Sequence, residues 1–301
     1  MKNKYVFVAV LLAAILLAGI GFTAVYLHQQ GREEEDDGFT VVTSFYPMYV
    51  AARNVVGDQG HVRLENLSEP QTGCLHDYQL TSEDMKLLAT ADVFIINGGG
   101  IETFLADVAA EYPDLTLIDA SEHVELLGEN AHAWMSMEDY SVQVQTICSG
   151  LSEADPAGAD QYAQNAERYL EKIDALRAEY RDAAQVLRGK SVVLFHEAYE
   201  YLTDEFGMQE AALLNLDEER QVSAGEVADI LSAIEEEQVS VILAEERYGR
   251  DMGDMMEQES SVQVVYLDPL NRGDYSADSY LDGMRSNLEL LIRAFEDSTG
   301  E

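Results

Sequence analysis

Four side chains in this sequence have the types and positions to bind a transition metal together: His76, His132, His196 and Asp268. His196 and Asp268 end apolar segments that read as strands, and the other two lie in loops that follow predicted strands. Three neutral imidazoles and one carboxylate suit a tetrahedral zinc ion, with ligand distances of about 2.0–2.2 Å. Dispersed ligands have no diagnostic spacing, so the pattern alone makes this site a hypothesis.

Three further residues are expected to lie beside such a site. Glu197 follows His196 directly, and Glu245 lies near the end of the predicted strand VSVILAEE. Either carboxylate is a candidate to accept a hydrogen bond from an imidazole N–H and so orient a ligand. Trp134, the only tryptophan, lies two residues after His132 and is expected to pack against it.

The two cysteines leave an alternative open. Cys74 lies two residues before His76, and a thiolate is a good zinc ligand. A small loop residue, or one half of a disulfide with Cys148, is the simpler interpretation. The sequence does not give the separation of the two Cα atoms, which decides whether they pair.

Strand and helix signals alternate from Thr40 onward, with about four strands on each side of one long helical segment. This order predicts an α/β protein of two lobes, each a roughly four-stranded parallel sheet covered by helices. Ligands of such sheets bind beyond the carboxyl ends of the strands. The histidines and Asp268 fall at such positions, so the fold would gather them between the lobes.

The long helical segment spans residues 157–189. Asp155-Pro156 is a start signal and Gly189 a stop signal. About 32 residues at 1.5 Å each give a rod of roughly 48 Å, which we interpret as a strut between the lobes. Its apolar positions recur in steps of four and three: Tyr162, Ala166, Tyr169, Ile173, Leu176, Tyr180, Ala183 and Leu187.

The N-terminus is expected to lie outside the folded lobes. Lys2 and Lys4 precede an apolar run over residues 5–27, which spans about 35 Å as a helix, enough to cross a bilayer. Its length favours an uncleaved anchor over a signal peptide, and cleavage after LLAGIG or FTA is the alternative. The lysines before the run and EEEDD after it place the remainder of the chain outside the membrane.

The charge of the chain excludes some partners. With 57 acidic and 18 basic residues and a net charge of −39, nucleic-acid binding, which needs a basic surface, is not expected. We expect contact with the membrane through the N-terminal segment only. Most acidic residues are interpreted as solvated surface.

Six segments, in this order, resemble the metal-receptor (solute-binding) proteins of zinc and manganese ABC transporters over residues 39–297. They are FTVVTSFYPMY, HDYQLTSEDMKLLATADVFIINGGGIETFL, NAHAW, SEADPAGADQYAQNAERYLEKIDAL, FHEAYEYLTDEFGM and VVYLDPL. The resemblance implies two lobes joined by one rigid helix, with the metal in the cleft between them. It also implies delivery of the ion to an ABC permease and no enzymatic activity.

The same resemblance assigns the ligands. His76 precedes Asp-Tyr, His132 lies two residues before Trp, His196 ends a strand, and Asp268 ends the last strand. Members with His at the third position resemble zinc receptors and members with Glu there resemble manganese receptors, so His196 implies zinc. The chain departs from the family by having Leu75 and Ala131 where Pro is usual. It also has neither a His-rich loop nor a lipid-anchor cysteine.

We therefore expect a monomeric, membrane-anchored zinc receptor outside the cell. The alternatives are a manganese or iron receptor of the same fold, a secreted zinc hydrolase, or an adhesin. No HExxH or nucleophile motif favours the hydrolase. The predicted division is an anchor (1–27), a spacer (28–38), a first lobe (39–155), a linking helix (156–189) and a second lobe (190–301).

Overall fold

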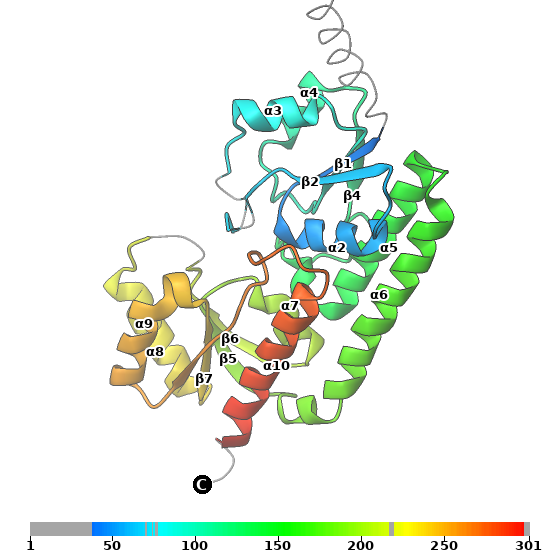
Figure 1. The fold of residues 1–301 in the computed structure, drawn as a ribbon. Coiled ribbons are helices and arrows are strands. Elements are labelled where there is room, and N and C mark those ends of the chain that lie inside the picture. Colours follow the sequence, from blue (N-terminus) through cyan, green and yellow to red (C-terminus); the bar gives the residue numbers. More distant parts are fainter. Residues whose placement is uncertain (1–37, 70, 74, 76–77, 217–219, 298–301) are drawn as a thin grey trace, which may run out of the picture. The chain divides into compact units, whose positions relative to one another are not determined.

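The computed structural model describes residues 38–69, 71–73, 75, 78–216 and 220–297, and its strands form two separate four-stranded parallel sheets (Figure 1). The first sheet has the order β2-β1-β3-β4 and the second the order β6-β5-β7-β8. The strands are β1 (Phe39–Thr43), β2 (Val62–Asn66), β3 (Val93–Ile96), β4 (Thr116–Asp119), β5 (Ser191–Leu194), β6 (Gln209–Leu213), β7 (Val241–Ala244) and β8 (Gln263–Tyr266). The predicted fold class is confirmed.

Helices follow the strands along the chain. The α-helices are α2 (Tyr46–Val56), α3 (Ser82–Leu88), α4 (Leu105–Glu111), α5 (Met137–Ala154), α6 (Ala159–Tyr180), α7 (Tyr199–Glu205), α8 (Ala224–Glu236), α9 (Glu246–Glu259) and α10 (Ser279–Asp297). Two short 3₁₀ helices are η1 (Ala133–Met135) and η2 (Ala183–Val186). We call the first sheet with its helices the first lobe, and the second sheet with its helices the second lobe.

The inner strands β3 and β7 are apolar throughout because helices cover both faces of each sheet. All four residues of β3 and all four of β7 are buried, which is the pattern of parallel sheets with two covered faces. The edge strand β2 instead alternates half-buried and exposed residues. Each lobe therefore has its own core on both sides of its sheet.

Two helices, α3 and α8, begin with a capping box. The Thr81 hydroxyl accepts a hydrogen bond from the backbone N–H of Asp84, whose carboxylate accepts one from the Thr81 backbone N–H. Ser223 and Glu226 form the same reciprocal pair at the start of α8. Such capping boxes satisfy N–H groups that a helix start otherwise leaves without partners.

The linking helix is shorter than predicted. Helix α6 ends at Tyr180, and the chain turns into η2 rather than continuing to Gly189. The buried residues beyond the turn, Ala184 and Leu187, are three apart, which is the period of a 3₁₀ helix. The apolar steps from Tyr162 to Leu176 face the core as predicted, whereas Ala183 is exposed.

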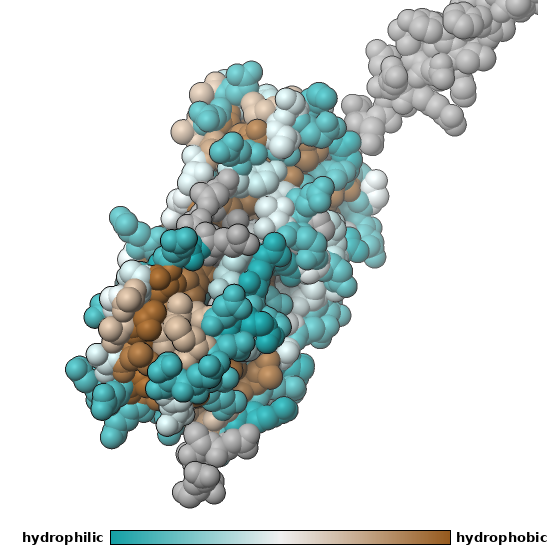
Figure 2. All heavy atoms as spheres, turned by 90° about the vertical axis from the view of Figure 1, so that its left-hand side faces the viewer, coloured by the Kyte–Doolittle hydropathy of each residue, from teal (hydrophilic) through white to brown (hydrophobic). Residues whose placement is uncertain are grey.

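The lobes are closely joined. Residues from Thr40 onward form one compact unit, in which α6 packs against α5 and α2 of the first lobe and α10 of the second. Figure 1 shows α6 running alongside these helices. The face on the α8–α9 side is largely hydrophilic with some apolar areas between (Figure 2), as the net charge of −39 leads one to expect.

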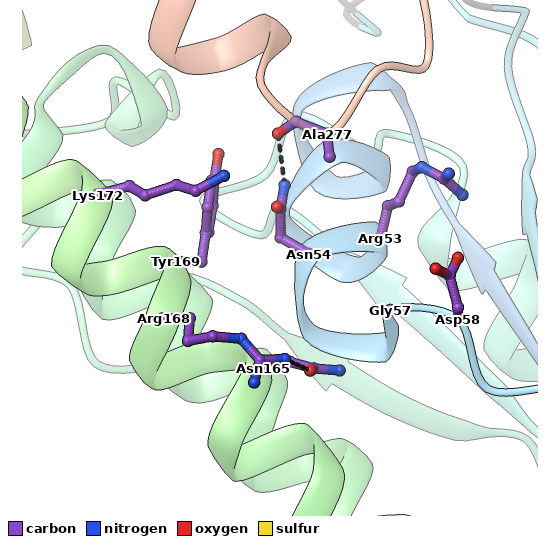
Figure 3. Close-up of a pocket in the computed structure, with 9 residues that line it drawn as sticks. All are labelled: Arg53, Asn54, Gly57, Asp58, Asn165, Arg168, Tyr169, Lys172 and Ala277. Carbon is purple, nitrogen blue, oxygen red and sulfur yellow. Dashed lines mark hydrogen bonds between the residues drawn. The ribbon is translucent and has the colours of Figure 1, made fainter.

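The segment between β8 and α10 crosses from the second lobe to the first. The Tyr275 ring lies 4.0 Å from the Tyr49 ring, centroid to centroid, and Asn66 Nδ2 donates to the Tyr275 hydroxyl. Asn54 Nδ2 donates to the Ala277 carbonyl at 2.8 Å, in the wall of a pocket that Figure 3 shows between α2, α6 and this segment. These contacts hold the residues just after Asp268 against the first lobe.

Truncating Ile173 tests the role of α6 in the core. Its side chain is fully buried, so Ile173→Ala removes buried apolar atoms and leaves a cavity. The free energy of unfolding should fall by about 2–5 kcal/mol in urea denaturation. Glu171→Ala, at an exposed position of the same helix, is the control and should change it by no more than about 0.5 kcal/mol. Equal effects of the two changes would contradict this placement of the helix.

Candidate metal site

Two of the predicted ligands, His132 and His196, lie against each other at the junction of the lobes. His132 directly precedes η1 in the first lobe, and His196 follows the end of β5 in the second. Both side chains are fully buried, and their ring centroids are 5.2 Å apart with the planes at 81°. Parallel strands end at one edge of each sheet, so the loops that follow them meet at the junction.

Trp134 packs beside His132 as predicted. The rings of the two residues are 4.9 Å apart, and the indole is fully buried. Its Nε1 donates a hydrogen bond of 2.8 Å to the carbonyl of Pro269, the residue after Asp268. Because a buried indole N–H needs an acceptor, Trp134 ties the His132 loop to the Asp268 loop of the second lobe.

Asn130 holds the His132 imidazole, and the sequence analysis did not identify it. Its Oδ1 lies 2.8 Å from His132 Nδ1 and accepts a 2.9 Å bond from the His132 backbone N–H. Glu197, predicted for this role, has its Oε1 at 3.7 Å from the same Nδ1. The only signal for Asn130 in the sequence was its place two residues before His132.

Glu245 lies beside His196, as the sequence analysis proposed. Its Oε2 is 3.4 Å from His196 Nδ1, and its Oε1 accepts a 2.6 Å bond from Nη1 of Arg272. Burial raises the pKa of the Glu245 carboxyl, but hydrogen bonds from His196 and Arg272 outweigh it and leave that pKa below its usual value. The carboxylate is therefore ionised, and its negative charge is balanced by Arg272.

Asp268 follows β8 and is more open to solvent than the two histidines. Its Oδ1 accepts a 2.8 Å bond from the Leu270 backbone N–H, and Asn287 pairs with both its backbone N–H and its carbonyl. Although the residue is exposed, the atoms packed around its carboxyl desolvate it and raise its pKa, and Glu245 adds to the rise. It lines a cavity of about 480 Å³ that Glu245 and Arg272 also line.

The fourth predicted ligand, His76, lies outside the described residues, as does Cys74. Within the described part of the chain, no group of three or more His, Cys, Asp or Glu side chains is placed to hold a metal ion. The structure thus brings His132 and His196 together, and the participation of His76 and Asp268 stays a prediction. Cys148 is half-buried in α5 and is a free cysteine in the structure.

The buried carboxylate of Glu102 stabilises the loop that carries His132, through Asn97. Glu102 accepts hydrogen bonds from the Ser44 hydroxyl and from the backbone N–H groups of Asn97 and Gly98. Asn97 Nδ2 in turn donates to the carbonyl of Ala131, the residue before His132. Because Ser44 and Asn97 directly follow β1 and β3, this network joins the strand ends to the loop that carries the imidazole.

The sequence of residues 41–294 matches the family described as "Zinc-uptake complex component A periplasmic" (ZnuA). The chain belongs to this family. It is therefore a metal-binding receptor of an ABC import system and not an enzyme, which excludes the zinc hydrolase considered above.

Similar proteins differ in the metal that they are named for. The manganese-binding lipoprotein MntA of Halalkalibacterium halodurans is 23% identical over 304 residues, which cover 97% of this chain and 98% of that protein. The high-affinity zinc uptake system protein ZnuA of Bacillus subtilis is 26% identical, over 86% and 88% of the two chains. The nickel-bound solute-binding protein FpvC of Pseudomonas aeruginosa superimposes with a TM-score of 0.79 at 30% identity, over 88% and 99% of the two chains.

No helix in the part of the chain that the structure describes is long and apolar enough to cross a membrane. The predicted anchor over residues 1–27 lies outside that part.

Protonation of Glu102 should make stability depend on pH. Burial raises the pKa of this carboxyl from 4.5 to about 7, so between these values the folded protein binds more protons than the unfolded chain. Its contribution to stability is complete below pH 4.5 and is lost as the pH rises through 7. Between pH 5 and 8, the free energy of unfolding of the metal-free protein should fall further than that of Glu102→Gln, by on the order of 3 kcal/mol.

The change Glu111→Gln, at an exposed position of α4, is the matched control and should leave the pH dependence as it is in the original protein. Parallel pH curves for the original protein and Glu102→Gln in urea denaturation would contradict the assignment.

Proposed function

We propose that this receptor captures Zn²⁺ in the cleft between its two lobes and delivers it to an ABC permease for import. The observation that supports this most is the pair of fully buried imidazoles, one from each lobe, with ring centroids 5.2 Å apart. A buried histidine pair gains little for folding alone, because polar groups are costly to bury. A metal ion bound by both rings would explain why the two imidazoles are buried together.

The ring nitrogens are arranged as those of metal ligands usually are. Nδ1 of His132 faces Asn130 Oδ1, and Nδ1 of His196 faces the Glu245 carboxylate. A hydrogen-bond acceptor at Nδ1 places the lone pair on Nε2, the atom through which such an imidazole binds a metal ion. Both rings thus have an Nε2 suited to ligation.

We propose His76 and Asp268 as the other two ligands. Asp268 follows the last strand at the edge of the second sheet where His196 also lies, and Trp134 links its loop to the His132 loop. Three nitrogens and one oxygen favour zinc over manganese, which prefers oxygen ligands. The same fold tuned to manganese or iron is the alternative, since relatives are named for several metals.

We further propose that the bulk of the chain works outside the cytoplasm as a monomer, held to the membrane by residues 1–27 through the spacer 28–38. Family membership supports the extracytoplasmic location. Beyond the spacer, we keep the predicted first lobe (39–155), linking segment (156–189) and second lobe (190–301). The contacts of Tyr275 and Ala277 with the first lobe restrict wide opening, so release would come from movement of a ligand-bearing loop.

Titration calorimetry of Zn²⁺ against Mn²⁺ tests the proposal. The protein should bind one Zn²⁺ with higher affinity than Mn²⁺, and His196→Ala should weaken zinc binding at least about 100-fold by removing one of four ligands. His123→Ala, which removes an exposed imidazole of the first lobe, is the control and should bind zinc as the original protein does. A preference for manganese, or unchanged zinc binding in His196→Ala, would contradict the proposal.

A further inference from the structure

The side chain of Asn130 contacts both lobes at once. Asn130 is buried, and its Oδ1 faces the backbone N–H and Nδ1 of His132 in the first lobe. Its Nδ2 donates to the second lobe, to the carbonyl of Glu197 at 2.8 Å and to Oε2 of Glu200 at 2.9 Å. Every polar atom of this amide therefore has partners.

These partners fix which way the amide points. A backbone carbonyl and a carboxylate only accept hydrogen bonds, so the atom that faces Glu197 and Glu200 must be the NH₂ group. A backbone N–H only donates, so the atom that faces His132 must be the oxygen. The assignment of O and N in Asn130, which is ordinarily ambiguous, thus follows from the chemistry of its neighbours.

The orientation of the amide in turn determines the tautomer of His132. An amide oxygen at 2.8 Å from Nδ1 can only accept, so Nδ1 must carry a proton. In the neutral imidazole the lone pair then lies on Nε2. Asn130 therefore selects the form of His132 that can bind a metal through Nε2.

The second lobe contacts both the side chain and the backbone of Asn130. Besides the amide contacts, the Tyr201 hydroxyl of α7 donates to the Asn130 backbone carbonyl at 2.7 Å and accepts from the Leu127 backbone N–H at 3.1 Å. Glu197, whose carbonyl the amide reaches, is the residue after His196. Asn130 thus links the His132 loop to the backbone next to His196.

We propose that Asn130 is a positioning residue of the metal site, which fixes the Nδ1–H tautomer of His132 and couples that ring to the backbone next to His196. The role of Asn130 in metal binding rests on the proposed function, because only a metal ion in the cleft would bind the two Nε2 atoms. The tautomer itself is a property of the metal-free protein, so it can be tested without any metal.

The test is a ¹⁵N NMR measurement on the full-length, metal-free protein with labelled histidine rings, in which His132→Gln assigns the His132 signals. The original protein should show a protonated Nδ1 and an unprotonated Nε2 at His132. Asn130→Ala should shift His132 toward the other tautomer and weaken zinc binding by about 10- to 100-fold, as is typical when a partner of a ligating imidazole is removed.

Asn165→Ala is the matched control. Asn165 is also a buried asparagine, and its Nδ2 also donates to two acceptors, the carbonyls of Val55 and Val56. It lies on α6 at the contact with α2, so its loss should change neither the His132 tautomer nor zinc binding. An unchanged tautomer in Asn130→Ala would overturn the inference, whatever metal the protein binds. Failure of zinc binding in the original protein would instead contradict the proposed function and leave the tautomer result standing.

Discussion

The structure at the junction of the lobes depends on the burial of two imidazoles. A ring that is withdrawn from water must find hydrogen-bond partners in the protein, because buried polar groups without them are costly. The Nδ1 of His132 meets Asn130 Oδ1, and the Nδ1 of His196 lies 3.4 Å from the Glu245 carboxylate, which Arg272 balances. Asn130 also contacts Glu197 and Glu200 of the second lobe, so residues of both lobes determine the position of the His132 ring.

The architecture explains why these networks meet. Each sheet is parallel, so its strand ends lie on one edge, and loops from both edges supply the residues of the junction. Several connections then cross between the lobes, among them Asn130 to Glu197, Trp134 to Pro269, and the segment around Tyr275 to α2. Under the proposed function, both imidazoles are held in place before any ion arrives, which reduces the cost of ordering them on binding.

The sequence predicted the fold well because its signals were local. Apolar runs such as those of β3 and β7, and capping residues such as Thr81 and Ser223, determine their elements through neighbours in the chain. The predicted end of this helix, at Gly189, was wrong because Tyr180, Ala183 and Leu187 continue the apolar spacing of a helix although α6 ends at Tyr180. The chain nevertheless turns there into η2, and Leu187 is fully buried just after it.

The candidate site was predicted in part for the same reason. His132, His196, Trp134 and Glu245 lie at strand ends or in recognisable segments, and the structure brings these four together. Asn130 and Arg272 were missed because their roles come from contacts with residues distant in the chain, Glu197 and Glu245, which leave no periodic signal in the sequence. Glu197 was expected to orient an imidazole by its carboxylate, whereas its backbone carbonyl makes the closer contact, with Asn130.

X-ray absorption at the zinc edge, recorded on the zinc-loaded full-length protein, tests the central claim most directly. We predict a first shell of four nitrogen and oxygen ligands at about 2.0–2.2 Å, with outer-shell scattering from three imidazoles. A sulfur ligand at about 2.3 Å would bring Cys74 into the site, and a six-coordinate oxygen-rich shell would indicate a different class of ion. Either result would contradict a zinc site formed by His76, His132, His196 and Asp268.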